Sequence, residues 1–192
     1  MIRKLTLFDD LNRVAQIIYQ TDASLFPFLF GKKEKAIPHL SKLISLDNNS
    51  FSYHNIHIDI EDKIEGIIIE LDASKHLDET KDFSQTFSFG QLMMLAIKQT
   101  LLFPILKHKN NEGRYIQNVC VDKNSRGKGI GTLLLLNAFD RAKKEGISKL
   151  FLDVEVNNKK AIALYENHGF IKQKTKRIWF IFPATYWMMK IL

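Results

Sequence analysis

The chain has little cysteine, few prolines and no long apolar run, and these shortages exclude several classes of protein. Its 192 residues include one cysteine, Cys120, so neither an intramolecular disulfide nor a cysteine-rich zinc site can form. The longest apolar stretch, Leu92–Leu106, is interrupted by Lys98 and Pro104 and falls short of the ~20 residues that span a membrane. The amino terminus lacks the apolar core of a signal peptide. We expect one cytoplasmic domain over residues 1–192.

Charge is distributed unevenly along a chain of otherwise ordinary globular composition. Hydrophobic residues make up 45% and charged residues 26%, which excludes a disordered or collagen-like protein. Residues 1–106 carry 11 basic and 14 acidic side chains, whereas residues 107–192 carry 17 and 7. A basic half indicates a polyanionic partner, which charge alone leaves open as nucleic acid, an acidic membrane or a phosphorylated cofactor.

Hydrophobic periodicity divides the first half into strands and helices. The expected elements are a strand at Ile2–Phe8, a helix capped by Asp9 or Asp10, a helix at Lys33–Ser45, strands at Phe51–Tyr53 and Ile56–Ile60, and a hairpin into a strand at Ile64–Leu71. Residues 73–113 then form an insertion: polar residues, a helix within Phe87–Leu106 and a loop at Lys107–Gly113. That helix packs on the core, covers a substrate cleft or forms a dimer face.

The second half alternates strands and helices. The expected elements are a strand at Tyr115–Val121, a loop at Asp122–Arg126, a helix at Gly129–Glu145, a strand at Lys149–Val156, a helix from Asn158 to His168, and strands at Phe170–Lys176, Trp179–Phe182 and Tyr186–Ile191. Strand–helix–strand units of this kind favour a partly parallel sheet with antiparallel additions, which is an α/β (α+β) fold. Cys120 is expected to be a buried strand thiol.

A glycine-rich loop follows the strand that contains Cys120. Gly127, Gly129 and Gly131 let a ligand approach the backbone closely, and the free amides of the following helix start bind phosphate. Arg126 and Lys128 add positive charge. The glycine spacing matches neither the dinucleotide fingerprint nor the nucleoside triphosphate loop, so the alternatives are a pyrophosphate cradle or a glycine-rich turn with surface lysines.

A second motif follows the next strand: Asn158, then Tyr165 seven residues later, then Gly169-Phe170. Together with Arg126, Gly129 and Gly131, which match an Arg/Gln-x-x-Gly-x-Gly/Ala cofactor loop, this order resembles the GCN5-related N-acetyltransferase (GNAT) superfamily. The two signatures cover residues 115–170. The resemblance implies a mixed central sheet of about six to seven strands flanked by helices.

The resemblance also implies a reaction and its site. Acetyl-CoA, or another acyl-CoA, would be the donor, with no metal, and its pantetheine arm would enter a gap between the strands Tyr115–Val121 and Lys149–Val156. The cofactor-binding residues it implies are Val119, Val121, Arg126, Gly127, Lys128, Gly129, Ile130, Gly131, Thr132 and Asn158. This site accounts for the basic half of the chain, so we expect no nucleic acid or membrane partner.

Direct attack of a primary amine on the thioester requires a proton donor for the thiolate and an acceptor for the amine proton. The motif assigns the donor role to Tyr165, which is otherwise a core tyrosine, and Asn158 also suits a helix N-cap. Many family members place an acid where this chain has Gln117, which cannot accept a proton. Asp153, Glu155 or a water chain could replace it, and the base stays open.

The acidic first half suggests that the acceptor, from a small molecule or a protein, is cationic; the alternative is a solvated acidic face. The residues in question are Asp59, Glu61, Asp62, Glu65, Glu70, Asp72, Asp78, Glu79 and Asp82. Phe83, Phe87 and Phe89 either line an acceptor pocket or pack beneath the insertion. An aromatic stretch at Ile178–Met189 either packs internally or joins two copies in a homodimer. Rival functions are a non-catalytic acyl-CoA-binding module and, less favoured, a nucleic-acid or anionic-membrane binder.

Overall fold

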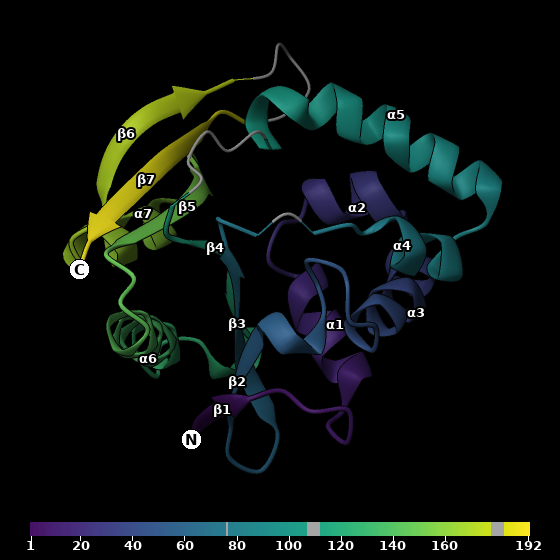
Figure 1. Ribbon diagram of the computed structural model, residues 1–192. Coiled ribbons are helices and arrows are strands. Elements are labelled where there is room, and N and C mark those ends of the chain that lie inside the picture. The colour runs from purple at the N-terminus through teal and green to yellow at the C-terminus, as the bar shows by residue number, and fades with distance from the viewer. Residues whose placement is uncertain (76, 107–111, 178–182) are drawn as a thin grey trace.

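The computed structural model describes residues 1–75, 77–106, 112–177 and 183–192. Within them seven strands form one mixed sheet (Figure 1). In order across the sheet, they are β1 (Ile2–Lys4), β2 (Ile56–Ile60), β3 (Ile64–Asp72), β4 (Arg114–Val121), β5 (Lys149–Glu155), β7 (Thr185–Ile191) and β6 (Ile171–Lys176). β4 and β5 are parallel, and the other neighbours are antiparallel. The predicted fold class is confirmed.

Helices cover both faces of this sheet. The described helices are α1 (Leu11–Tyr19), α2 (Leu25–Phe30), α3 (Lys33–Ile44), α4 (Thr80–Thr86), α5 (Phe89–Leu106), α6 (Ile130–Lys144) and α7 (Lys159–Asn167). β3 buries Ile67 and Ile69 in a core shared with α1, α2 and α3, and Ile68 in a second core shared with α6 and α7. Alternate residues of a strand face opposite sides, so burial on both faces explains the continuous apolar run of β3. Along the part of the chain that the structure describes, no helix is both long and apolar enough to cross a membrane.

Two expectations for the first half are wrong, each because a polar side chain organises a local turn. β1 ends at Lys4, since Asp9 accepts hydrogen bonds from the Thr6 amide and from Arg3. The predicted strand at Phe51–Tyr53 is a turn, in which Ser52 caps a short 3₁₀ helix. The polar stretch before Phe87, for which no element was predicted, contains α4. The predicted strand Trp179–Phe182 and most of the predicted loop Lys107–Gly113 lie outside the described residues.

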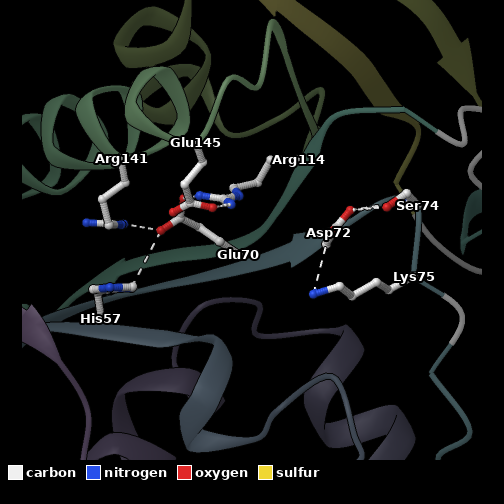
Figure 2. A network of polar contacts seen from close by, with 8 residues as sticks. All are labelled: His57, Glu70, Asp72, Ser74, Lys75, Arg114, Arg141 and Glu145. Carbon is white, nitrogen blue, oxygen red and sulfur yellow. Dashed lines mark hydrogen bonds and ion pairs between the residues drawn. The ribbon is translucent and has the colours of Figure 1, made fainter.

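A buried ionic network joins the end of α6 to three strands (Figure 2). The Glu70 carboxylate on β3 pairs with Arg141 of α6, with Arg114 of β4 at 3.6 Å, and lies 3.6 Å from His57 of β2. Arg114 also pairs with Glu145, just beyond the last turn of α6. Burial lowers the pKa of His57 to about 4, and the positive charges of Arg141, Lys4 and Arg114 contribute to this shift. The network ties the orientation of α6 to the sheet.

Lowering the pH from about 7.5 to about 5 is expected to destabilise the folded protein through His57 by roughly 2 kcal/mol. The unfolded chain binds this proton with an ordinary pKa near 6.5, whereas the folded protein binds it only near pH 4. The unfolded state therefore holds more protons between these values, so stability falls as pH drops through that window. Urea unfolding at the two pH values measures the loss.

The matched variants separate His57 from other acid-sensitive groups. His57→Gln is expected to lose this part of the pH dependence, while His54→Gln, which changes an exposed histidine beside Asp47, is expected to keep it. An equal loss of stability in the wild type and in His57→Gln would contradict the assignment.

Candidate functional site

The two parallel strands separate halfway along their length. β4 pairs with β5 through Arg114–Ile116, whereas it continues along β3 to Val121, and β5 continues along β7 to Glu155. A cavity of about 770 Å³ opens where they part. From these two strands, it is lined by Tyr115, Ile116, Gln117, Asn118 and Val119 of β4 and by Asp153, Val154 and Glu155 of β5. The gap expected between these strands is therefore present.

Tyr165 lines this cavity from α7, and the end of that helix fixes its position. Gly169 adopts a left-handed conformation (φ +83°), and the amides of Gly169 and Phe170 donate to the carbonyls of Glu166 and Tyr165. This Schellman arrangement brings the last helical turn and the following residue together. The rings of Tyr165 and Phe170 consequently meet edge to face, with centroids 5.8 Å apart. The Gly169-Phe170 segment thus fixes the position of the Tyr165 ring.

The environment of the Tyr165 phenol keeps it protonated. Tyr165 is 7% exposed. Its burial raises the pKa of the phenol, and the nearby Cys120 thiol raises that pKa to a smaller extent. Cys120 is itself a buried free cysteine, as expected, and burial raises the pKa of its thiol as well. A neutral phenol beside the cavity can donate a proton, whereas the buried thiol is no ready nucleophile.

The glycine-rich loop leads into α6 with a backbone that suits an anion. Gly127 and Gly129 have φ values of +84° and +79°, and a β-carbon on either would have no other atom within 4 Å. Gly129 caps α6 without a side-chain hydrogen bond, and the first intrahelical bond runs from the Leu133 amide to the Gly129 carbonyl. The amides of Ile130, Gly131 and Thr132 are therefore left for a ligand in open space.

Side chains around the loop hold it in place. The Ser125 hydroxyl donates to Glu65 of β3 at 2.8 Å, and Lys128 Nζ lies 3.3 Å from the same Glu65 oxygen. The Ser125 hydrogen bond, more than the Lys128 charge, lowers the pKa of Glu65. Arg126 Nε donates to the Val121 carbonyl at 3.1 Å. The positive charges predicted for phosphate binding thus also shape the loop.

The loop and the cavity are adjacent but distinct. A β-carbon at Gly131 would lie 3.5 Å from Leu164 of α7 and 3.9 Å from Val121, so the first turn of α6 lies beside α7. Of the predicted cofactor residues, Val119 and Asn158 line the cavity with Tyr165. Val121 and the loop residues 126–132 lie outside that lining. Asn158 is also the N-cap of α7, where its Oδ1 accepts from the Ala161 amide.

The candidate bases stand on the two walls of the gap. Gln117 lines the cavity from β4, opposite Asp153 and Glu155 of β5. Asp153 accepts hydrogen bonds from the Tyr115 hydroxyl at 3.3 Å and from Lys176 at 3.0 Å. Burial raises the pKa of Asp153, although Lys176 opposes the shift. Burial also raises the pKa of Glu155, and the neighbouring carboxylate of Asp22 adds to the rise.

Most of the acidic side chains named for acceptor recruitment have structural partners instead. Asp82 is buried and accepts hydrogen bonds from Asn48 and Asn49, Asp59 pairs with the amino terminus, and Glu65 and Glu70 hold the loop and the ionic network. Among that set, Asp72 and Glu79 are cavity-lining residues. Of the three phenylalanines, Phe83 lines the cavity, Phe87 stacks on Phe30 in the core, and Phe89 is 79% exposed.

The remaining residues singled out from the sequence fall outside the cavity lining or pack internally. His168 Nδ1 contacts the Leu164 carbonyl at the end of α7. In the aromatic carboxyl-terminal stretch, Trp187 stacks on Phe151 with centroids 5.4 Å apart, which is packing within one chain.

Sequence reasoning missed one wall of the cavity. Asp22 and apolar residues of α2 line the cavity there, and Thr185 of β7 also lines the cavity. Asp22 three residues before Leu25, with Pro27 in the first turn, is a helix-start signal that could have revealed α2. No local pattern marks Thr185, because its position depends on the pairing of β5 with β7.

Comparison with known proteins gives one family. Residues 97–170 match the model of the acetyltransferase (GNAT) family. Over 96 residues, the chain is 36% identical to the [ribosomal protein bS18]-alanine N-acetyltransferase of Escherichia coli K12. That alignment covers 50% of this chain and 57% of the relative, so the chain spans little more than half the length of such relatives.

Two solved structures share the fold over nearly the whole chain. An N-acetyltransferase from Staphylococcus aureus Mu50 superposes with a TM-score of 0.78 at 21% identity, covering 98% of this chain and 99% of that one. A GNAT family acetyltransferase from Elizabethkingia anophelis, solved with acetyl-CoA bound, gives 0.58 at 14% identity, covering 100% and 97%. The family match over residues 97–170, the shared fold and the separated parallel strands all support the acetyltransferase (GNAT) superfamily for this chain.

Proposed function

We propose that this protein is an N-acetyltransferase that transfers an acetyl group from acetyl-CoA to a primary amine of a small molecule or protein. The separation of β4 from β5, which opens a cavity lined by Tyr165, is the observation that carries the proposal. The matched relative is named an alanine N-acetyltransferase, and the structural neighbour from Elizabethkingia anophelis has acetyl-CoA bound in the same fold. Acetyl-CoA supplies the thioester that the amine attacks.

The described residues fit this donor. The open-faced amides at the start of α6, with Arg126 and Lys128 beside them, suit a pyrophosphate, since a helix N-terminus favours negative charge. β4 has no strand partner on its β5 side beyond Ile116 in the described sheet, so the backbone at Val119 can bind an extended arm and orient a carbonyl. The implied roles of Val121, residues 126–132 and Asn158 are part of this proposal.

Residues that line the cavity donate and accept the protons of the reaction. Tyr165 donates a proton to the departing thiolate, because its phenol is neutral, buried and held by Phe170. Gln117 cannot act as a base, whereas Asp153 and Glu155 of the opposite wall can accept the proton of the amine, directly or through water. The acceptor is cationic, and its amine loses a proton before or during the attack.

Titration of acetyl-CoA into the purified protein by calorimetry tests the proposal. We expect micromolar binding by the wild type and binding at least about tenfold weaker by Gly129→Glu, which places a like charge where the pyrophosphate would lie. Gly146→Glu is the matched control: Gly146 also has a positive φ (+71°) and open space, but it follows the other end of α6. Its affinity is expected to stay close to that of the wild type.

Two results of this titration would contradict the proposal. A folded wild type that binds no acetyl-CoA would refute the acyltransferase function. Equal losses of affinity in both glycine variants would remove the pyrophosphate from the predicted loop.

A further inference from the structure

A second group of polar side chains lines the cavity on the wall that faces away from the family motifs. It consists of Asp22 in the connection between α1 and α2, Glu155 at the end of β5, and Thr185 at the start of β7. Glu155 and Thr185 are cross-strand partners in the pairing of β5 with β7. Three separate elements of the fold therefore bring these oxygen atoms to one place.

Asp22 is a carboxylate with a fixed orientation. Its Oδ1 accepts hydrogen bonds from the Ser24 amide at 2.8 Å and from the Leu25 amide at 2.7 Å. These bonds hold the group at the start of α2 and leave Oδ2 with unused acceptor capacity. Glu155 meets the carboxyl group of Asp22, and this contact raises the pKa of Glu155 further than burial alone. Two carboxyl groups are thus held side by side in the cavity lining.

Neither member of this pair has a cationic partner within the described part of the chain. Among those residues, no lysine or arginine forms an ion pair with Asp22 or Glu155. The other carboxylates of the lining are occupied. Asp153 pairs with Lys176, Asp72 with Ser74 and Lys75, and Glu79 accepts from the Ser50 amide. Asp22 and Glu155 are consequently the lining carboxyl groups that remain available to a positively charged ligand.

Thr185 provides an independent sign of a ligand. The residue is 9% exposed, and its Oγ1 has no hydrogen-bond partner within the described chain. A buried hydroxyl without a partner destabilises a fold, so such a group is retained where something else uses it. Its Oγ1, a Glu155 oxygen and Asp22 Oδ2 together offer three acceptors, which is the number of N–H donors on a primary ammonium group.

We propose that Asp22, Glu155 and Thr185 form the subsite that binds a positively charged primary amino group of the acceptor. The subsite rests on the proposed function, because it lies in the cavity where the strands part. It determines specificity: an acceptor with an ammonium group binds there, and a neutral molecule of the same shape does not. The ammonium can belong to a small amine or to the amino terminus of a peptide.

Calorimetry on the protein saturated with coenzyme A, which prevents turnover, tests this subsite. The probes are 1,4-diaminobutane and a tripeptide beginning with alanine, with butane-1,4-diol and the N-formylated tripeptide as their uncharged counterparts. We expect at least one charged probe to bind and its uncharged counterpart to bind at least about tenfold more weakly. Which probe binds identifies the source of the ammonium group.

Three near-isosteric variants locate the binding. Asp22→Asn keeps the Oδ1 acceptor for the two amides, and both it and Glu155→Gln are expected to weaken the charged probe at least about tenfold. Thr185→Val is expected to weaken it by about threefold or more without lowering the melting temperature, because the lost hydroxyl has no partner among the described residues. Glu61→Gln, on the exposed β2–β3 turn, is the control and should bind like the wild type.

The results separate the two proposals. Unchanged affinity in both Asp22→Asn and Glu155→Gln, or a wild type that binds coenzyme A but neither amine, would overturn the subsite and leave the acetyl-CoA site standing. A wild type that binds no coenzyme A or acetyl-CoA would overturn both.

Discussion

Replacing Tyr165 by phenylalanine is expected to lower kcat for acetyl transfer by about 10²-fold or more, with the affinity for acetyl-CoA changed by less than about twofold. The variant removes only the phenolic hydroxyl. The ring remains, so its edge-to-face contact with Phe170 and its burial between α7 and the sheet are preserved. A loss confined to kcat therefore reports the proton that the hydroxyl donates.

The burial of Tyr165 gives the direction of this proton transfer. Because burial raises the pKa of the phenol, the hydroxyl carries its proton throughout the neutral pH range. A neutral phenol cannot deprotonate the amine at neutral pH, but it can protonate a departing thiolate. Steady-state kinetics with any turned-over amine, together with calorimetry for the donor, measure the two quantities separately.

Tyr186→Phe is the matched control, because Tyr186 lies on β7 and stacks against Lys172 rather than lining the cavity. It should keep its kcat. A Tyr165→Phe variant with wild-type kcat would refute the donor role. A wild type that binds acetyl-CoA but turns over no amine would support the rival interpretation, a non-catalytic acyl-CoA-binding module, which is consistent with Gln117 in place of an acid.

The local structure of the segments proposed to bind the donor could be predicted because its signals are local. Gly129 sets the start of α6, Asn158 caps α7, and Gly169 ends it, and each of these effects depends on a few consecutive residues. The Tyr165 ring is positioned by the same short segment. The mixed sheet, partly parallel with antiparallel additions, also followed from the alternation of strand and helix patterns.

The acceptor side could not be predicted in the same way. Asp22, Glu155 and Thr185 meet only when α2, β5 and β7 have assembled, and no sequence period connects them. Counting acidic residues in the first half was misleading for a physical reason. Carboxylates such as Asp82 and Glu70 are used to satisfy buried amides and guanidinium groups, so their charge is not presented to a ligand.

Replacing Glu70 by glutamine is expected to lower the free energy of unfolding by about 3 to 5 kcal/mol. The Glu70 side chain is 4% exposed and pairs with Arg114 and Arg141, whose side chains are 11% and 18% exposed. Glutamine keeps the shape but removes the charge. Two guanidinium groups would then remain close together in a poorly solvated site with the carboxylate of Glu145 as their nearest counter-charge (Figure 2).

Glu145→Gln is the matched comparison, because Glu145 pairs with the same Arg114 but its side chain is 53% exposed. Water screens an ion pair at such a position, so the expected loss is below about 1 kcal/mol. Urea unfolding of the two variants near neutral pH gives the difference directly. Both changes remove a carboxylate that pairs with Arg114, but Glu70 is more deeply buried and also pairs with Arg141.

The same pair of variants tests whether the network orients the donor site. Arg141 and Glu145 lie at the carboxyl end of α6, and the glycine-rich loop that we propose binds acetyl-CoA lies at its amino end, so a loosened carboxyl end lets the helix shift on the sheet. We expect Glu70→Gln to weaken acetyl-CoA binding several-fold even where the protein remains folded, and Glu145→Gln to leave it unchanged. Equal stability losses in the two variants would contradict the special role given to the buried Glu70 carboxylate, and equal acetyl-CoA affinities would contradict its effect on the glycine-rich loop.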